Sequence, residues 1–250
     1  MSIVRIFHDI EEMSRYAADF IRERAVLCVR DQGIFTIALS GGSTPRRLYE
    51  LLASKPFSES IPWEHTHIFW GDERCVPPDH PDSNYRMAAQ SFLDHVPLPP
   101  GNIHRMKGDI NPHTKAAEDY ESEIREFFKS MGCEPFEFPV FDLILLGIGA
   151  DGHTASLFPG NETLKERERW VSAACAPPEM PVEKRITLTL PVIDAARWVL
   201  FLVSGKRKRD IVRTLFDDPD AIDLLPAAMI EERTGVFWFL DFTIDDEGRR

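Results

Sequence analysis

Two kinds of segment alternate along the chain: short runs that are apolar or alternate between apolar and polar residues, and longer stretches with helical periodicity. The runs predict strands at residues 34–39, 67–70, 141–146, 186–190, 198–203 and 236–240. Apolar residues at helical spacing predict helices over residues 9–30, 45–53, 84–95, 114–131 and 208–216. This alternation predicts an α/β fold in which a mostly parallel sheet is covered by helices on both faces. No repeat, low-complexity tract or clear linker interrupts the pattern, so we expect a single domain over residues 1–250.

The segment DLILLGIGADGHTASLFPG, residues 142–160, carries the strongest signal for a site. Its strand ends at Gly147, and Gly149 and Gly152 come before His153. Glycine lets the backbone approach a ligand closely because it has no Cβ, and ligands of open α/β sheets bind at the carboxyl ends of strands. An imidazole at that edge exchanges a proton near neutral pH. The alternative is a tight turn with a hydrogen-bonded histidine.

The segment SGGSTP, residues 40–45, follows a predicted strand and opens a predicted helix. Free backbone N–H groups and the helix dipole at such a junction favour a bound phosphate. The segment is neither a Walker motif nor a dinucleotide fingerprint. The alternative is an ordinary strand–turn–helix junction in which Thr44 caps the helix.

Charged residues follow or precede three other predicted strands. Asp72, Glu73 and Arg74 come just after the strand at 67–70, and an arginine there can form a bidentate contact with a carboxylate or phosphate. A buried structural ion pair is the alternative. Lys184 and Arg185 precede the strand at 186–190, and four cations at 206–209 open the last predicted helix. Cations in a first turn oppose the helix dipole, and a bound phosphate would resolve this conflict; solvated surface is the alternative for both clusters.

Composition excludes several classes of protein. A formal net charge of −12 argues against a general nucleic-acid binder, which needs a dominant basic surface. No apolar stretch approaches the ~20 residues of a membrane span, and the N-terminal residues lack the pattern of a signal peptide. The four cysteines are scattered without zinc-site spacing, which favours reduced thiols, a cytoplasmic location and no metal.

Taken together, these segments resemble the 6-phosphogluconolactonase family. SGGSTP, GDER, GIGADGHTASLFP, KRITLTLPVIDAA, a glycine–lysine segment after a strand and LPAAMI occur in the order of that family, from about Ile34 to Asp241. The related glucosamine-6-phosphate deaminases share the GxGxDGH core but continue with an FNEP-type sequence and usually carry an aromatic residue at the place of Arg74. TASLFP and Arg74 fit the lactonases instead. The resemblance implies a three-layer α/β/α sandwich with a modified Rossmann-like sheet, and neither a metal nor a nucleotide cofactor.

The resemblance also implies roles for residues of this chain. His153 is the expected general base, and Asp72 and Arg74 are expected to line the catalytic site. The expected substrate-binding residues are Ser40, Gly41, Gly42, Ser43, Thr44, Gly149, Asp151, Gly152, Arg185 and Lys208. The family spacing of glycine, two residues and lysine selects Lys208, with Lys206 as the alternative register. Whether Asp72 orients His153 or binds sugar hydroxyls stays open.

The implied reaction is the hydrolysis of 6-phospho-D-glucono-1,5-lactone to 6-phospho-D-gluconate in the oxidative pentose phosphate pathway. One rival is a sugar-phosphate deaminase or isomerase in which Asp72 removes a carbon-bound proton. Another is a sugar-phosphate sensor, although the residues before the first predicted strand form only about one helix and leave no room for a DNA-binding segment. A serine hydrolase is disfavoured because no GxSxG motif occurs. The sequence leaves the oligomeric state open, and a monomer is compatible with it.

Overall fold

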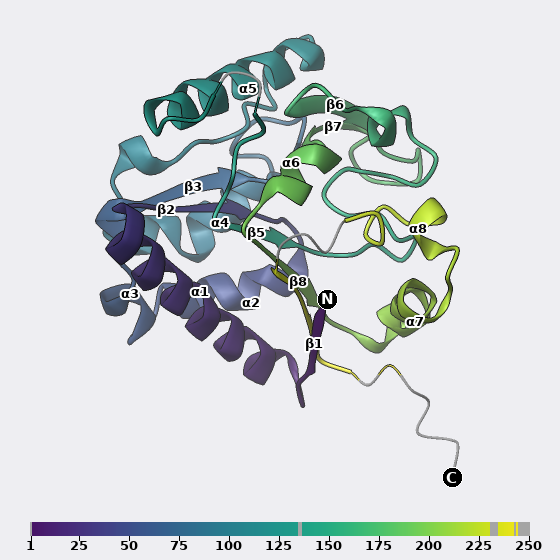
Figure 1. Ribbon diagram of the computed structural model, residues 1–250, viewed down its shortest axis with the longest axis horizontal. Coiled ribbons are helices and arrows are strands. Elements are labelled where there is room, and N and C mark those ends of the chain that lie inside the picture. The colour runs from purple at the N-terminus through teal and green to yellow at the C-terminus, as the bar shows by residue number, and fades with distance from the viewer. Residues whose placement is uncertain (1, 135–136, 231–234, 243, 245–250) are drawn as a thin grey trace.

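A computed structural model describes residues 2–134, 137–230, 235–242 and 244. Within these residues a six-stranded sheet has the order β1-β9-β8-β5-β2-β3, and every neighbouring pair is parallel (Figure 1). Its strands are β1 (Ile3–Ile6), β2 (Phe35–Leu39), β3 (Thr66–Trp70), β5 (Leu143–Leu146), β8 (Trp198–Val203) and β9 (Gly235–Leu240). The prediction of an α/β fold with a mostly parallel sheet is confirmed.

A second, antiparallel sheet in the described residues has the order β4-β7-β6 and was not predicted. Its strands are β4 (Asp72–Arg74), β6 (Val171–Cys175) and β7 (Lys184–Leu188). The Leu188 N–H donates to the Gly71 carbonyl at 2.8 Å, directly after β3. The small sheet therefore lies beyond the carboxyl end of β3, beside the edge where ligands of α/β sheets bind.

Helices cover both faces of the central sheet. The helices of the described residues are α1 (Ile10–Gln32), α2 (Ser43–Leu52), α3 (Phe57–Ser60), α4 (Asn84–Ser91), α5 (His113–Ser130), α6 (Leu190–Ala195), α7 (Arg209–Asp217) and α8 (Ala221–Leu224), and the longer ones form these two layers. The ring of Phe20 in α1 lies 4.8 Å from that of Phe237, whereas Phe216 in α7 lies 5.4 Å from Trp238. Because successive residues of β9 point to opposite faces, α1 and α7 cover opposite faces. Figure 1 shows α1 and α2 on one side of the sheet and α5 and α6 on the other.

Several element boundaries differ from the prediction. Helix α2 begins at Ser43 rather than Pro45, and β7 spans Lys184–Leu188 rather than 186–190, because Leu190 already begins α6. The helix expected to reach His95 ends at Ser91 and is followed by a 3-10 turn. Strand β1 was missed because all four of its residues are exposed and show no buried pattern.

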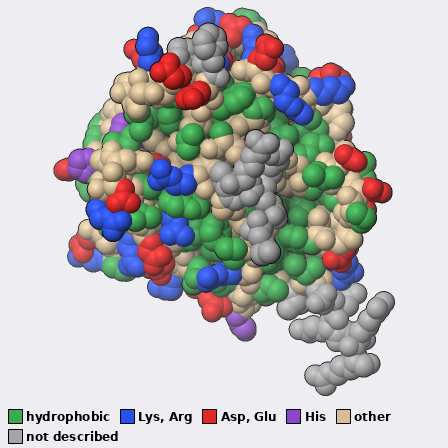
Figure 2. Space-filling model, viewed as in Figure 1, with side chains coloured by type: hydrophobic (Ala, Val, Ile, Leu, Met, Phe, Trp, Pro, Cys, Tyr) green, Lys and Arg blue, Asp and Glu red, His purple; other side chains and the backbone are tan. Residues whose placement is uncertain are grey.

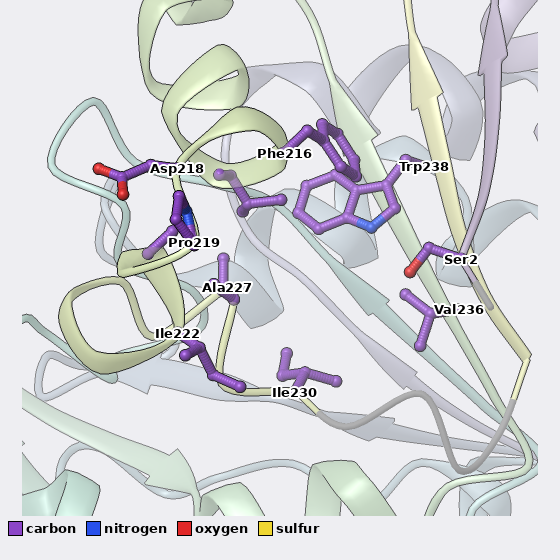
Figure 3. A pocket seen from close by; sticks show the side chains of 12 residues that line it. Ser2, Phe216, Asp218, Pro219, Ile222, Ala227, Ile230, Val236 and Trp238 are labelled. Atoms are coloured by element: carbon purple, nitrogen blue, oxygen red, sulfur yellow. The ribbon is translucent and has the colours of Figure 1, made fainter.

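The surface carries both signs of charge, and the face in Figure 2 shows basic and acidic side chains intermixed. A cavity of about 680 Å³ lies beside β9, between α7 and α8 (Figure 3). Its lining includes Phe216, Ile222 and Trp238, so it is largely apolar. None of the helices in the described part of the chain has the length and apolar content needed to cross a bilayer.

Candidate active site

A cavity of about 350 Å³ lies at the carboxyl edge of the central sheet. Its wall includes the residues that directly follow three parallel strands, namely Ser40 after β2, Gly147 after β5 and Ser204 after β8. Asp72, two residues beyond the end of β3, completes this edge. The strands therefore deliver four segments that are far apart in sequence to one place, as expected for a parallel sheet.

The loop after β5 holds His153 through a tight backbone turn. The Gly149 N–H donates to the His153 carbonyl at 2.8 Å, and the Gly152 N–H donates to the Gly149 carbonyl at 3.1 Å. A Cβ added to Gly149 would lie 2.1 Å from His153 Nδ1, and Gly152 has a φ of +83°. Glycine is required at the first position by space and at the second by backbone conformation.

Asp151 is the hydrogen-bond partner of the His153 ring. Its Oδ1 lies 2.5 Å from Nδ1, and it also accepts from the His153 backbone N–H at 3.2 Å. Burial works to raise the pKa of Asp151, but the hydrogen bond and charge of His153 outweigh it and hold that pKa below its usual value. A carboxylate at Nδ1 fixes the tautomer that carries its proton there, which leaves Nε2 as the basic nitrogen.

Asp72 contacts other partners. Its Oδ2 accepts from Ser156 Oγ at 2.7 Å, and its Oδ1 accepts from Asn84 Nδ2 at 3.2 Å. The side chain is 8% exposed and lines the cavity. Asp151 therefore orients His153, and the carboxylate of Asp72 is held by neutral donors on the cavity wall.

Glu73 serves the fold rather than the cavity. Its carboxylate accepts from the backbone N–H groups of Arg74, Asn84 and Tyr85 at 2.7, 2.7 and 2.8 Å, and from Ser83 Oγ at 3.0 Å. Burial raises its pKa, and these hydrogen bonds oppose the rise. A carboxylate at a helix start satisfies N–H groups that have no intrahelical acceptor. Glu73 thus fixes the first turn of α4 against β4.

Arg74 and Arg185 line the cavity side by side. They are directly opposite residues of the antiparallel pair β4 and β7. Arg74 Nη1 donates to the Asp82 carbonyl at 2.7 Å, and Arg185 Nε donates to the Val182 carbonyl at 2.7 Å. No ion pair joins Arg74 to a carboxylate among the described residues, and its buried Nε has no partner there. The ion pair considered from the sequence is thus absent from that part of the chain.

Lys184 and Arg185, at the start of β7, differ in exposure. This difference decides which of them could face a ligand and which is solvated surface. Lys184 is exposed, whereas Arg185 is only 6% exposed. Burial, with the positive charge of Arg74 nearby, lowers the pKa of Arg185, and the charges of Asp72 and Glu73 oppose this. The solvated reading holds for Lys184 and fails for Arg185.

The glycine-rich loop places the start of α2 at the cavity. Gly41, Gly42, Ser43 and Thr44 are all part of the wall. The helix begins at Ser43, and no side chain caps it, so the expected alternative of a Thr44 cap is wrong. The N–H groups of a first helical turn have no intrahelical acceptors and favour an anion.

Lys208, rather than Lys206, lies in the cavity wall. Its Nζ donates to the Ile148 carbonyl. Burial lowers the pKa of its ammonium group, and the charge of Asp151 opposes this. Lys206 is exposed and lies outside the wall. The 3-10 turn of residues 206–208 before α7 turns one cation inward and leaves the others outside.

Most of the residues predicted for the site meet at this cavity. Asp151 and Gly152 are outside the wall itself: Asp151 supports His153, and Gly152 packs against Leu225, which lies 2.6 Å from a Cβ built there. The predicted residues in the wall are Ser40, Gly41, Gly42, Ser43, Thr44, Asp72, Arg74, Gly149, His153, Arg185 and Lys208.

Sequence reasoning missed other residues of the wall, which come from loops and helix starts. They include Asn84, Gly147, Ile148, Ser156, Phe158, Met180, Pro181 and Ser204. The TASLFP segment marked Ser156 and Phe158 only as part of a family motif, and no local pattern marked Asn84. No group of three or more His, Cys, Asp or Glu side chains in the described residues is arranged to hold a metal ion.

The chain is similar to known proteins over most of its length. A sequence model of the family described as glucosamine-6-phosphate isomerases/6-phosphogluconolactonase matches residues 8–238. The chain is 42% identical over 240 residues to a 6-phosphogluconolactonase of Nostoc sp., covering 95% of each chain. It is 42% identical over 227 residues to a 6-phosphogluconolactonase of Synechocystis sp., covering 88% of this chain and 90% of that one.

Solved structures extend the likeness to the fold. The 6-phosphogluconolactonase from Trypanosoma cruzi matches with a TM-score of 0.85 at 32% identity, covering 98% of this chain and 96% of that one. The family indicated by the motifs is thereby confirmed, and with it the expectation of an enzyme. The chain belongs to the glucosamine-6-phosphate isomerase/6-phosphogluconolactonase family.

Proposed function

We propose that this enzyme hydrolyses 6-phospho-D-glucono-1,5-lactone to 6-phospho-D-gluconate, the second step of the oxidative pentose phosphate pathway. The observation that carries the proposal is the His153–Asp151 pair, 2.5 Å apart between Nδ1 and Oδ1, at a cavity that Arg74, Arg185 and Lys208 also line. This combination supplies a base for water and positive charge for a phosphate. A lactone is a reactive ester, so no covalent nucleophile is needed.

His153 is the general base of this proposal. With the Nδ1 proton donated to Asp151, Nε2 takes a proton from a water molecule as that water attacks the lactone carbonyl carbon. The imidazolium formed is stabilised by the Asp151 carboxylate. When the tetrahedral intermediate collapses, the bond to the ring oxygen breaks, and the same imidazolium returns its proton to that oxygen.

Negative charge grows on the carbonyl oxygen during the attack and needs a positioned donor. Arg74 is the candidate, because it lines the cavity and its buried Nε has no partner among the described residues. A guanidinium stays charged throughout and costs little reorganisation during the reaction.

The phosphate is held away from the reacting bond. The uncapped start of α2, Arg185 and Lys208 are its proposed partners. Binding energy from a remote phosphate accelerates the reaction by fixing the orientation of the lactone relative to His153. The proposal further includes a cytoplasmic location, one domain and no nucleic-acid partner.

The direct test is an assay with freshly prepared 6-phosphogluconolactone, with the product measured by a coupled 6-phosphogluconate dehydrogenase and spontaneous hydrolysis subtracted. We expect hydrolysis well above the spontaneous rate. A parallel incubation with glucosamine 6-phosphate tests the rival reaction. Release of ammonia there, without acceleration of lactone hydrolysis, would overturn the proposal in favour of a deaminase that uses Asp72.

A further inference from the structure

Asn84 is a polar residue of the cavity wall to which the proposed mechanism gives no role. It is the first residue of α4 and is 1% exposed. Its backbone N–H donates to Glu73 Oε1 at 2.7 Å, which fixes the position of the residue independently of its side chain. The side-chain amide is therefore not needed to hold Asn84 at the start of α4.

The orientation of this amide is set by its neighbours. Asn84 Nδ2 donates to the Asp72 backbone carbonyl at 2.9 Å and to Asp72 Oδ1 at 3.2 Å. Both partners are acceptors, and only the NH₂ group of an amide donates. The amide oxygen must therefore point away from Asp72.

On that other side the oxygen lies against the glycine-rich loop. A Cβ built on Gly41 would lie 1.8 Å from Asn84 Oδ1, so only glycine leaves room for it. The oxygen is buried and has no hydrogen-bond partner among the described residues. A buried carbonyl oxygen without a donor costs free energy, and such an atom in a cavity wall is suited to a ligand that brings the donor.

We infer that Asn84 determines specificity by accepting, at Oδ1, a hydrogen bond from a ring hydroxyl of the lactone. The inference rests on the proposed function. The lactone carbonyl and ring oxygen only accept hydrogen bonds, and a phosphate near neutral pH is mostly deprotonated. The hydroxyls at C2, C3 and C4 are therefore the donors that this substrate offers. Asn84 thus recognises a hydroxyl group of the substrate, whereas Arg185 and Lys208 bind its phosphate.

Asp72 and Ser156 complete this part of the wall. Ser156 Oγ holds Asp72 Oδ2 at 2.7 Å, so the carboxylate that orients Asn84 is itself fixed. The chain Ser156–Asp72–Asn84 thus keeps the amide oxygen in place before the substrate arrives, which reduces the entropy lost on binding.

The test compares Asn84→Ala with the unmodified enzyme on 6-phosphogluconolactone and on its 2-deoxy, 3-deoxy and 4-deoxy analogues. We expect Asn84→Ala to lower kcat/KM on the full substrate about fivefold or more, the usual effect of an unpaired buried partner. One deoxy analogue should show a similar loss with the unmodified enzyme and little further loss with the variant. Gln90→Ala, an exposed change on α4, is the matched control and should behave as the unmodified enzyme on all four substrates.

Two results overturn the inference. An equal loss on every analogue would show that Asn84 only positions Asp72, and unchanged kcat/KM on the full substrate would show that the oxygen meets no substrate group. If Asn84→Ala does not fold, Asn84→Ser keeps the backbone N–H to Glu73 and is compared in the same way. An unmodified enzyme that hydrolyses none of the lactones would instead overturn the proposed function, and the inference with it.

Discussion

Arg74 and Arg185 face each other across β4 and β7 at the cavity wall. Like charges at directly opposite positions destabilise an antiparallel pair, and burial together with the charge of Arg74 already lowers the pKa of Arg185. Asp72 and Glu73 offset part of this repulsion, but Glu73 is bound to the amides of α4. An anion in the cavity would offset the rest, which is the electrostatic condition for a sugar-phosphate site.

The role of Arg74 is tested by Arg74→Lys. Lysine keeps the positive charge but loses the planar fork, whose Nη1 donates to the Asp82 carbonyl and whose buried Nε has no partner among the described residues. We expect turnover to fall about tenfold or more, while the melting temperature changes by only a few degrees. Both are measured on one preparation. A clear drop in melting temperature with normal activity per folded molecule would assign Arg74 a structural role instead.

The phosphate contacts are tested by Arg185→Ala and Lys208→Ala. Each should reduce kcat/KM for the phosphorylated lactone roughly tenfold or more relative to unphosphorylated gluconolactone, because a charge-assisted hydrogen bond is lost. Lys206→Ala is the matched control, since Lys206 is exposed outside the wall. Equal losses on both lactones would mean that these cations do not bind the phosphate, and a selective loss in Lys206→Ala would reassign the contact.

The general base is tested by His153→Ala. Turnover should fall by roughly 10²- to 10⁴-fold, the usual contribution of a general base. The fold should persist, because the side chain is at a cavity wall rather than in the core. Circular dichroism and the melting temperature check the fold. Near-normal turnover in the folded variant would remove His153 from the mechanism.

Gly149→Ala tests whether the loop positions that base. The added Cβ would lie 2.1 Å from His153 Nδ1 and 2.4 Å from Asp151 Oδ1, so the pair must move. A displacement of about 1 Å can cost around 10²-fold in rate, and we expect a loss of this order in kcat. Gly101→Ala is the control, because a Cβ there meets nothing within 4 Å. Equal activities of the two variants would contradict the positioning role.

A pair of histidines away from the cavity leads us to predict how the free energy of unfolding changes at acidic pH. His67 Nδ1 lies 3.1 Å from His104 Nε2, and Glu123 Oε1 lies 3.0 Å from His104 Nδ1. Burial, with the charge of His104, lowers the pKa of His67 from 6.5 to about 4. The folded state therefore resists protonation of His67, and the associated stability is lost as pH falls from 6.5 towards about 4.

His67→Phe removes this titration and keeps a ring beside Phe127, whose centroid lies 4.7 Å from that of His67. The decline of unfolding free energy between pH 7 and pH 4.5 should become shallower by about 1 kcal/mol, since solvent screens a half-buried ring. Urea denaturation at the two pH values measures it. His65→Phe, a change at an exposed residue nearby, is the control and should leave the decline of unfolding free energy unchanged. If His67→Phe shows the same decline as the unmodified protein, His67 is not the group responsible.

The local pattern was sufficient for five of the six strands of the central sheet, all but β1, and for the place of the cavity. Apolar runs such as Leu143–Leu146 and Trp198–Val203 are strands because both of their faces are buried, and this requires near-continuous hydrophobicity. The glycines and polar residues that end these runs marked the carboxyl edge, where the cavity lies. The order of the motifs indicated the family, and the family's spacing of glycine, two residues and lysine selected Lys208 rather than Lys206.

Pairing between distant segments decided what the sequence left open. Strand β4 has three residues and β1 is exposed throughout, so neither carries a local signal; each exists because β7 or β9 offers it backbone partners. The same holds at the site. The sequence suggested Asp72 as a residue that could orient His153 and placed Asp151 among the substrate-binding residues, whereas the folded loop places Asp151 at His153 Nδ1.

The sequence by itself thus determined the fold class, the family and the edge of the sheet at which the cavity lies. These features depend on which residues are buried and where glycine frees the backbone, and both are visible in short stretches of sequence. Tertiary structure alone decided that Asp151 contacts the His153 ring, that two arginines face one another, and that Asn84 turns its amide nitrogen to Asp72 and its oxygen to the glycine-rich loop. Hydrogen bonds have directional requirements that depend on side chains brought together from distant segments, and no local pattern encodes those directions.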